Sequence, residues 1–221
     1  MKKKNKGKKI IKILIIIVFI VLLIIYLYNL RVKNIYVKGN KYLSDYEIIE
    51  LAGLNNYPKM FSKIVFKIES KIKISPYIKD VDVKRNIFGC IIINIDEYDI
   101  LLKDQTDNKV YLSNYKKISL DDKILGVPSL INYVESNILK GFLEKLNKID
   151  KDILSKISEI EYKPNEYDKD LFLFYMNDGN YVYATTRRLL NINKYSSVLE
   201  SLEGKKGILY LDSGNHFEIL S

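Results

Sequence analysis

The sequence has few of the side chains that most often carry catalysis or hold metals. Among 221 residues there is one cysteine, Cys90, and one histidine, His216. A single cysteine excludes an internal disulfide, and a single histidine excludes a zinc site built on paired histidines. General acid–base catalysis would have only one histidine available, although histidine is the residue type that most often performs it. An enzyme of this sequence would therefore depend on other side chains.

The short motifs of well-known enzyme classes are also absent. The sequence contains no phosphate-binding G-x-x-x-x-G-K loop, no G-x-G-x-x-G, no H-E-x-x-H and no G-x-S-x-G. His216 follows Asp212 and Ser213 in a predicted hairpin, and near neighbours in one turn do not form a catalytic triad. Cys90 opens an apolar run, which favours packing over reactivity. We expect no catalytic residue among them.

Two acidic runs could be interpreted as paired catalytic carboxylates or as calcium ligands. These are Asp121–Asp122 and residues 166–170. Neither run has the alternating ligands and central glycine of a calcium loop, so solvated turns are the favoured interpretation. The sequence predicts no metal and no cofactor.

Positive charge is concentrated in the first twelve residues. The net charge is +9, and seven of the 36 basic residues are lysines in residues 1–12, where no acid accompanies them. The rest of the chain has 29 basic against 27 acidic residues. This balance predicts no nucleic-acid partner for the body of the protein, and the basic tail is typical of a membrane-topology signal.

A long apolar run follows the basic tail. Residues 13–28 include no polar side chain other than two tyrosine hydroxyls, and at 1.5 Å per residue the stretch 10–30 is about 30 Å long, which matches a bilayer core. No small-x-small cleavage site follows, so a retained anchor is favoured over a signal peptide. Lysines before the span place the amino terminus in the cytoplasm. Ile13 and Phe19 are predicted anchor residues, with Tyr28 in the interfacial belt.

The region after the span begins with a β-α-α-β-β pattern. A β-rich run covers 32–38, and a capping box of Ser44 and Glu47 opens a helix over 45–52. A second helix over 62–73 has Ile64, Ile68 and Ile72 on one face, which we expect to pack on the sheet. Alternating strands follow over 78–85 and 90–97.

After residue 98 the sequence predicts strands, polar turns and helical stretches. Hairpins are predicted over 100–112, around Asp-Gly in 171–185, and over 208–220. Helical spacing is present in 142–157, as one run or two short pieces, and in 192–202. The expected fold class is α+β, with a cytoplasmic tail (1–12), a transmembrane helix (13–30), a first domain (31–102) and a β domain (103–221).

The order of these features resembles the FtsQ/DivIB family of bacterial cell-division proteins. The resemblance is carried by a basic tail, one span, V-K-G-N at 37–40, P-Y-I-K-D-V-D-V-K-R at 76–85 and I-x-I-D-E at 93–97. It continues through D-G-x-x-V and I-L-Y-L-D within 177–212. Tyr98-Asp99 replaces the expected Arg-Pro, and Asn86 replaces a proline after Arg85. The resemblance implies a POTRA domain, followed by a β domain whose last strands bind other division proteins.

A non-enzymatic divisome scaffold is therefore the expected function. Through the resemblance, the terminal hairpin is expected to pair with single-pass FtsB-type (DivIC) and FtsL-type proteins at the septum and to regulate septal wall synthesis. The predicted partner-binding residues are Tyr210, Ser213, His216, Phe217 and Ile219. We expect no later segment to cover this strand edge, which can accept an incoming strand. A POTRA-bearing secretion or folding factor is the alternative, followed by a membrane-anchored wall hydrolase.

Overall fold

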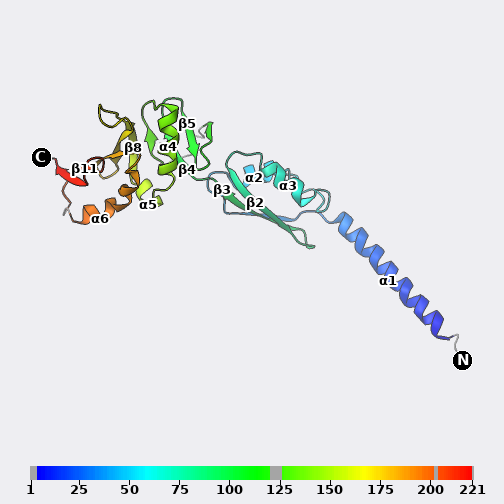
Figure 1. Cartoon of the computed structure of the whole chain (residues 1–221). Helices are drawn as coiled ribbons and strands as arrows, with labels where there is room; N and C mark the ends of the chain where they lie inside the picture. Colours follow the sequence, from blue (N-terminus) through cyan, green and yellow to red (C-terminus); the bar gives the residue numbers. More distant parts are fainter. Residues whose placement is uncertain (1–3, 120–125, 202–203, 221) are drawn as a thin grey trace. The chain divides into compact units, whose positions relative to one another are not determined.

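The computed structural model describes residues 4–119, 126–201 and 204–220 (Figure 1). The acidic pair Asp121–Asp122 lies outside the described residues. Contacts divide the chain into two compact units between Glu97 and Tyr98. This division differs from the predicted one at 102/103, because the next strand, β4 (Ile100–Asp104), pairs within the second unit.

The first unit begins with the apolar helix α1 (Lys4–Asn29). Its sheet and helices are β1 (Asn34–Lys38), α2 (Asp45–Leu51), α3 (Val65–Ile72), β2 (Ile78–Arg85) and β3 (Cys90–Glu97). The sheet order is β1-β3-β2, with β1 parallel and β2 antiparallel to β3. The predicted β-α-α-β-β order is confirmed.

Local signals explain where the first helices begin. The Ser44 hydroxyl accepts a hydrogen bond from the Glu47 N–H, while the Glu47 side chain accepts one from the Ser44 N–H, so the predicted capping box is present. Ile68 and Ile72 are buried among the sheet residues. Ile64 is 60% exposed, and its expected place in the core is wrong, because α3 starts at Val65 and not at residue 62, which leaves Ile64 at the N-cap.

The second unit is built on a nine-stranded sheet of order β12-β11-β10-β9-β8-β7-β4-β5-β6. Besides β4, its strands are β5 (Lys109–Leu112), β6 (Lys117–Ser119), β7 (Ser129–Leu130), β8 (Ile157–Tyr162), β9 (Leu171–Met176), β10 (Tyr181–Thr185), β11 (Gly207–Tyr210) and β12 (His216–Ile219). The helices are α4 (Ser136–Leu146), α5 (Lys151–Leu154), the 3-10 helix η1 (Leu189–Lys194) and α6 (Tyr195–Glu200). This mixture confirms the α+β class.

The predicted helical run 142–157 ends early, because Ile157 is the first residue of β8. A register shift between Ile157 and Glu159 leaves Ile157 and Ile160 both buried in the same core. Ile149, Ile153 and Ile157 are buried in this core at four-residue spacing, which imitates a helix in the sequence. Strand β8 was therefore missed, as was β7, which is only two residues long.

The turn between β9 and β10 joins three parts of the second core. Asp178 accepts hydrogen bonds from the buried Tyr195 hydroxyl at 2.9 and 2.8 Å and from the Asn180 N–H at 3.1 Å. The Asn180 side-chain oxygen accepts the Gly207 N–H at 2.9 Å. This turn therefore positions both α6 and β11, the strand that carries the terminal hairpin.

Candidate partner-binding site

Strand β12 lies at the edge of the nine-stranded sheet and pairs with β11. The Leu220 N–H donates to the Lys206 carbonyl at 3.0 Å, which fixes the alternation of the antiparallel ladder. In such a ladder every second residue turns its N–H and C=O away from the neighbouring strand. In β12 these residues are Phe217 and Ile219. Their backbone groups point to the free side of β12, where the described residues supply no further strand.

Two of the predicted side chains, Tyr210 and His216, form a stack on one face of this hairpin. Their ring centroids are 4.6 Å apart with an interplanar angle of 10°. Tyr183 of β10 extends the stack, 5.4 Å from Tyr210 and at 9°. Burial, together with a 3.1 Å hydrogen bond from its hydroxyl to Glu218, raises the pKa of Tyr210 above its ordinary value. The site therefore presents three planar rings across three neighbouring strands.

Tyr183 was not among the predicted site residues. A signal was available, since Tyr181 and Tyr183 alternate with Val182 and Ala184, which are buried. The period of two places both tyrosines on the opposite face from the core.

The other predicted residues lie elsewhere on the hairpin. Phe217 is half-buried and packs against the second core, with its ring directly over Gly207, where an added Cβ would lie 2.6 Å from the ring. Ile219 is on the same face and is 52% exposed. Ser213 is in the turn, where its hydroxyl approaches Asp212 at 3.4 Å. The structure thus divides the five predicted residues between two faces and a turn.

A pocket of about 410 Å³ adjoins the stacked rings. Its lining residues are Lys163, Pro164, Asn165, Leu171, Tyr183, Tyr210 and Asp212. A lining of mostly apolar and aromatic residues with one cation and one anion can accept a side chain from a bound segment. A partner strand paired with β12 would therefore have this pocket nearby, on the sheet face that carries the stacked rings of Tyr183 and Tyr210.

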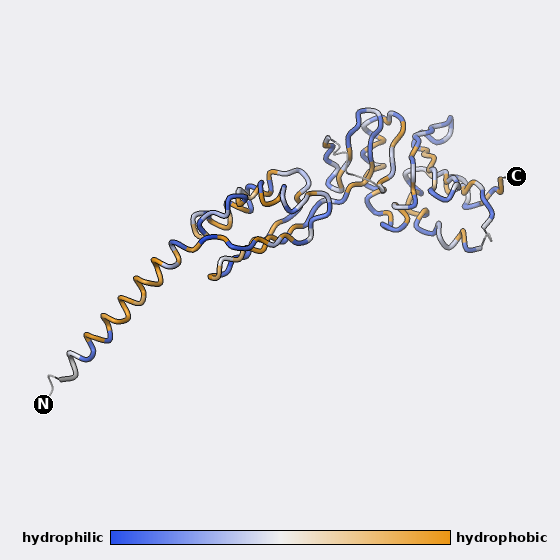
Figure 2. The backbone as a smooth tube through the Cα atoms, turned by 180° about the vertical axis from the view of Figure 1, so that it is seen from behind, coloured by the Kyte–Doolittle hydropathy of each residue, from blue (hydrophilic) through white to orange (hydrophobic). Residues whose placement is uncertain are grey.

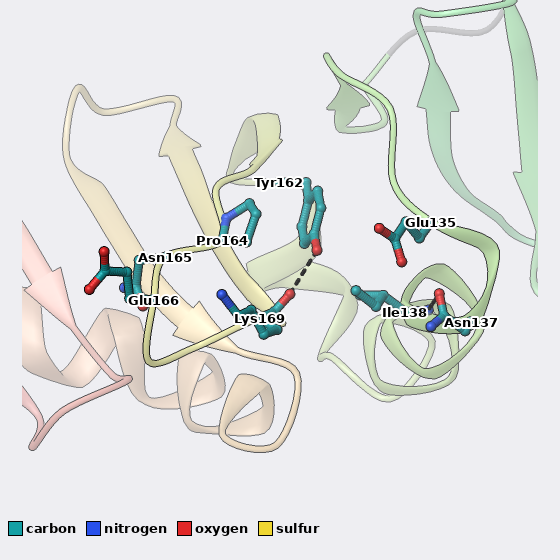
Figure 3. A pocket seen from close by; sticks show the side chains of 8 residues that line it. All are labelled: Glu135, Asn137, Ile138, Tyr162, Pro164, Asn165, Glu166 and Lys169. Atoms are coloured by element: carbon teal, nitrogen blue, oxygen red, sulfur yellow. Dashed lines mark hydrogen bonds between the residues drawn. The ribbon is translucent and has the colours of Figure 1, made fainter.

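A larger pocket of about 670 Å³ lies between the start of α4 and the β8–β9 loop (Figure 3). Glu135 and Glu166 are on opposite sides of it, with Tyr162 between them. The Tyr162 hydroxyl donates to the Lys169 carbonyl at 2.7 Å, so this hydroxyl is already engaged. The pocket holds neither histidine nor cysteine, and none of its residues was predicted as a site residue.

The side chains considered for catalysis are far from a triad arrangement. The His216 ring stacks on Tyr210, whereas the Ser213 hydroxyl approaches Asp212. Cys90 is a free thiol of intermediate exposure. Across the described ranges, His, Cys, Asp and Glu side chains form no group of three that could hold a metal.

The apolar helix carries the predicted anchor residues. One helix in the described chain, Gly7–Asn29, is long and apolar enough to cross a membrane, and most of its length is coloured as hydrophobic in Figure 2. Ile13, Phe19 and Tyr28 are 56%, 66% and 69% exposed on it. A water-exposed helix of this composition would be unfavourable, whereas a bilayer would cover it.

Comparisons with known proteins support the family resemblance found in the sequence. The family model for the FtsQ-type POTRA domain matches residues 30–98. The chain is 31% identical to the cell division protein DivIB of Listeria monocytogenes (strain EGD-e) over 195 residues, 85% of this chain and 72% of that protein. It is 28% identical to DivIB of Bacillus subtilis (strain 168) over 228 residues, 98% of this chain and 86% of that protein.

A solved structure of the major extracytoplasmic domain of DivIB from Geobacillus stearothermophilus also matches, with a TM-score of 0.40 and 22% identity. The match covers 49% of this chain and 96% of that domain. The family is shown by the sequence relatives, which are named as cell-division proteins and not as enzymes. With its single membrane-spanning helix and FtsQ-type POTRA domain, the chain belongs to the DivIB family of bacterial cell-division proteins.

Proposed function

We propose that this chain is a non-enzymatic scaffold of the divisome that captures its partners by adding a strand to β12. The observation that carries the proposal is the outward-facing backbone of Phe217 and Ile219 at the sheet edge. Unpaired N–H and C=O groups supply affinity to an extended segment, and side chains on either side supply selectivity. The stacked rings of Tyr183, Tyr210 and His216 would contact the partner's side chains on one face.

The proposed partners are FtsB-type (DivIC) and FtsL-type single-pass proteins, with the amino terminus of this chain in the cytoplasm and both folded units outside. A partner in the same membrane is confined to a thin layer, so modest strand pairing is strengthened by a high effective concentration. The scaffold would then link early and late division proteins at the septum and regulate septal peptidoglycan synthesis. The units before and after residue 97 would act as separately folding domains.

A proline scan of β12 tests strand addition. Ile219→Pro removes an outward N–H and places a ring where an incoming strand would approach, whereas edge strands tolerate proline at such a position. Ile219→Ala removes the same side chain and keeps the N–H. We expect Ile219→Pro to weaken capture of a purified DivIC-type partner at least tenfold relative to Ile219→Ala, about 1.4 kcal/mol.

The control is Glu218→Pro, which removes an N–H that faces β11 and should lower the stability of the second unit. The full chain in detergent would be used for both binding and urea unfolding. Equal capture by Ile219→Pro and Ile219→Ala, with both variants folded, would refute strand addition at this edge. In cells, a fluorescent fusion of Ile219→Pro should stay in the membrane and recruit less partner to the septum.

A further inference from the structure

The membrane span leads into the POTRA domain without a linker. The Leu30 N–H donates to the Tyr26 carbonyl at 3.0 Å, so Leu30 continues the hydrogen bonding of α1. The Leu30 side chain is nevertheless only 6% exposed and belongs to the POTRA core. Its carbonyl accepts the Met60 N–H at 2.8 Å, and the Val32 N–H donates to the Pro58 carbonyl at 3.0 Å. The domain therefore begins at the outer surface of the bilayer.

The turn between β2 and β3 is held beside this exit point. The Lys33 N–H donates to the Gly89 carbonyl at 2.7 Å. The Asn86 side chain accepts hydrogen bonds from the backbone N–H groups of Phe88 and Cys90, at 2.9 and 3.1 Å, which fixes the turn. At its tip Ile87 is 56% and Phe88 71% exposed, and Figure 2 colours the end of this hairpin as hydrophobic.

A second apolar pair lies next to the same turn. Phe61 is 41% and Ile64 60% exposed. Arg85 connects them to the hairpin, because its guanidinium lies 4.7 Å from the Phe61 ring centroid and donates to the Met60 and Lys63 carbonyls at 3.1 and 2.8 Å. We call Phe61, Ile64, Ile87 and Phe88 the exit patch.

Charge around the exit patch has one sign. The segments that meet there, 30–34, 58–66 and 85–89, contain no aspartate or glutamate. They contain the basic residues Arg31, Lys33, Lys59, Lys63 and Arg85. The Lys59 ammonium lies 4.0 Å from the ring centroid of Tyr28, at the end of the span. Exposed apolar side chains surrounded by cations are typical of surfaces that bind the interfacial layer of an anionic membrane.

We infer that the exit patch is a second membrane contact, which seats the POTRA domain on the bilayer that its own span crosses. Phe88 and Ile87 enter the interfacial layer as an apolar wedge, and Arg31, Lys33 and Lys59 contact lipid phosphates. The contact needs only the span, so it is independent of strand addition at β12. It restricts how far the POTRA domain can tilt away from the membrane.

Spin labels in the full chain, reconstituted into nanodiscs of equal parts phosphatidylglycerol and phosphatidylcholine, test this contact. In a Cys90→Ser background, Phe88→Cys places a label on the patch. Ile74→Cys is the matched control, because Ile74 is apolar, 77% exposed and just before β2, about 25 Å along that strand from the turn. We expect the label at 88 to be relaxed more by oxygen than by a water-soluble nickel chelate, and the label at 74 to show the reverse.

A label at 88 that is as accessible to nickel as the label at 74 would overturn the inference and leave the patch for a protein partner. Lipid composition tests the electrostatic part. Nanodiscs of phosphatidylcholine alone should increase nickel access at 88 at least twofold, whereas unchanged access would overturn the role of the basic residues. Both labelled positions are on the surface, and circular dichroism checks that the variants fold.

Discussion

The carboxylate of Glu97 should be a major determinant of POTRA stability, and its replacement is a sharp test of the structure. Glu97 is 2% exposed, and its two oxygens accept three consecutive backbone N–H groups, from Lys41 at 3.0 Å, Tyr42 at 2.7 Å and Leu43 at 3.2 Å. The side chain thereby ties the end of β3 to the loop before α2. Glu97→Ala takes this acceptor away from the three N–H groups and leaves a small cavity.

The magnitude follows from the hydrogen bonds. Each bond to a charged group contributes about 1.5 kcal/mol at the low end, but nearby water can partly replace the carboxylate at half-buried N–H groups, so we expect Glu97→Ala to cost about 3 kcal/mol. Glu97→Gln keeps one oxygen and should cost about half as much. That loss is a large share of the 5–15 kcal/mol that stabilises a typical domain.

Urea unfolding of the full chain in detergent measures the loss of stability in each Glu97 variant. Hydrogen exchange measured by mass spectrometry shows where in the chain that loss occurs. Faster exchange should be confined at first to the amides of 41–43, and the POTRA transition should shift to lower urea in the order wild type, Gln, Ala. If Glu97→Ala unfolds at the wild-type urea concentration and its 41–43 amides exchange as slowly, the carboxylate does not hold this loop.

Three further predictions follow from buried groups and from the span. Ile68→Asp puts an unpaired charge into the POTRA core and should destabilise it by about 3–5 kcal/mol, which urea unfolding measures and an unchanged midpoint would contradict. For Asp104, burial alone would raise its pKa, but hydrogen bonds from Lys117 and Thr106 outweigh burial and hold the pKa below the ordinary 3.8. The Asp104 carboxylate therefore stabilises the fold fully above pH 3.8, and this stabilisation is lost as pH falls through the lower pKa of the folded state. In Asp104→Asn, the free energy of unfolding should depend less on pH in this acidic range. An export-dependent reporter joined after Ser221 should be active, and cytoplasmic fluorescence from the same position would contradict the proposed orientation.

Strands β2 and β3 of the POTRA sheet were predictable because each has one buried face. The alternation of Val81 and Val83 with charged residues, and of Ile91, Ile93 and Ile95 with other residues, gave β2 and β3 with their observed bounds. The capping box and the Asp-Gly turn were equally local signals. Such features are encoded within a few residues, so sequence alone is sufficient to find them.

The arrangement of the partner site was less predictable, because it depends on which distant strands become neighbours. β10 and β11 are parallel and separated by η1 and α6, so the stack of Tyr183 on Tyr210 joins residues that no local pattern relates. The same holds for Phe217, whose packing over Gly207 depends on hairpin register. Alternation along β12 gives two faces, but only the register shows which one meets the core.

The order of strands in the second sheet has a consequence for biosynthesis. β12 can be placed only after β11, and β11 only after the parallel pairing with β10 has been formed across the intervening η1 and α6. Parallel pairing over such a separation is slow, because loop-closure entropy is lost before any contact is gained. The edge that the proposed function assigns to a partner is thus among the last surfaces to form as the chain folds. Recruitment through β12 would act as quality control, since a misfolded copy could reside in the membrane without entering the division machinery.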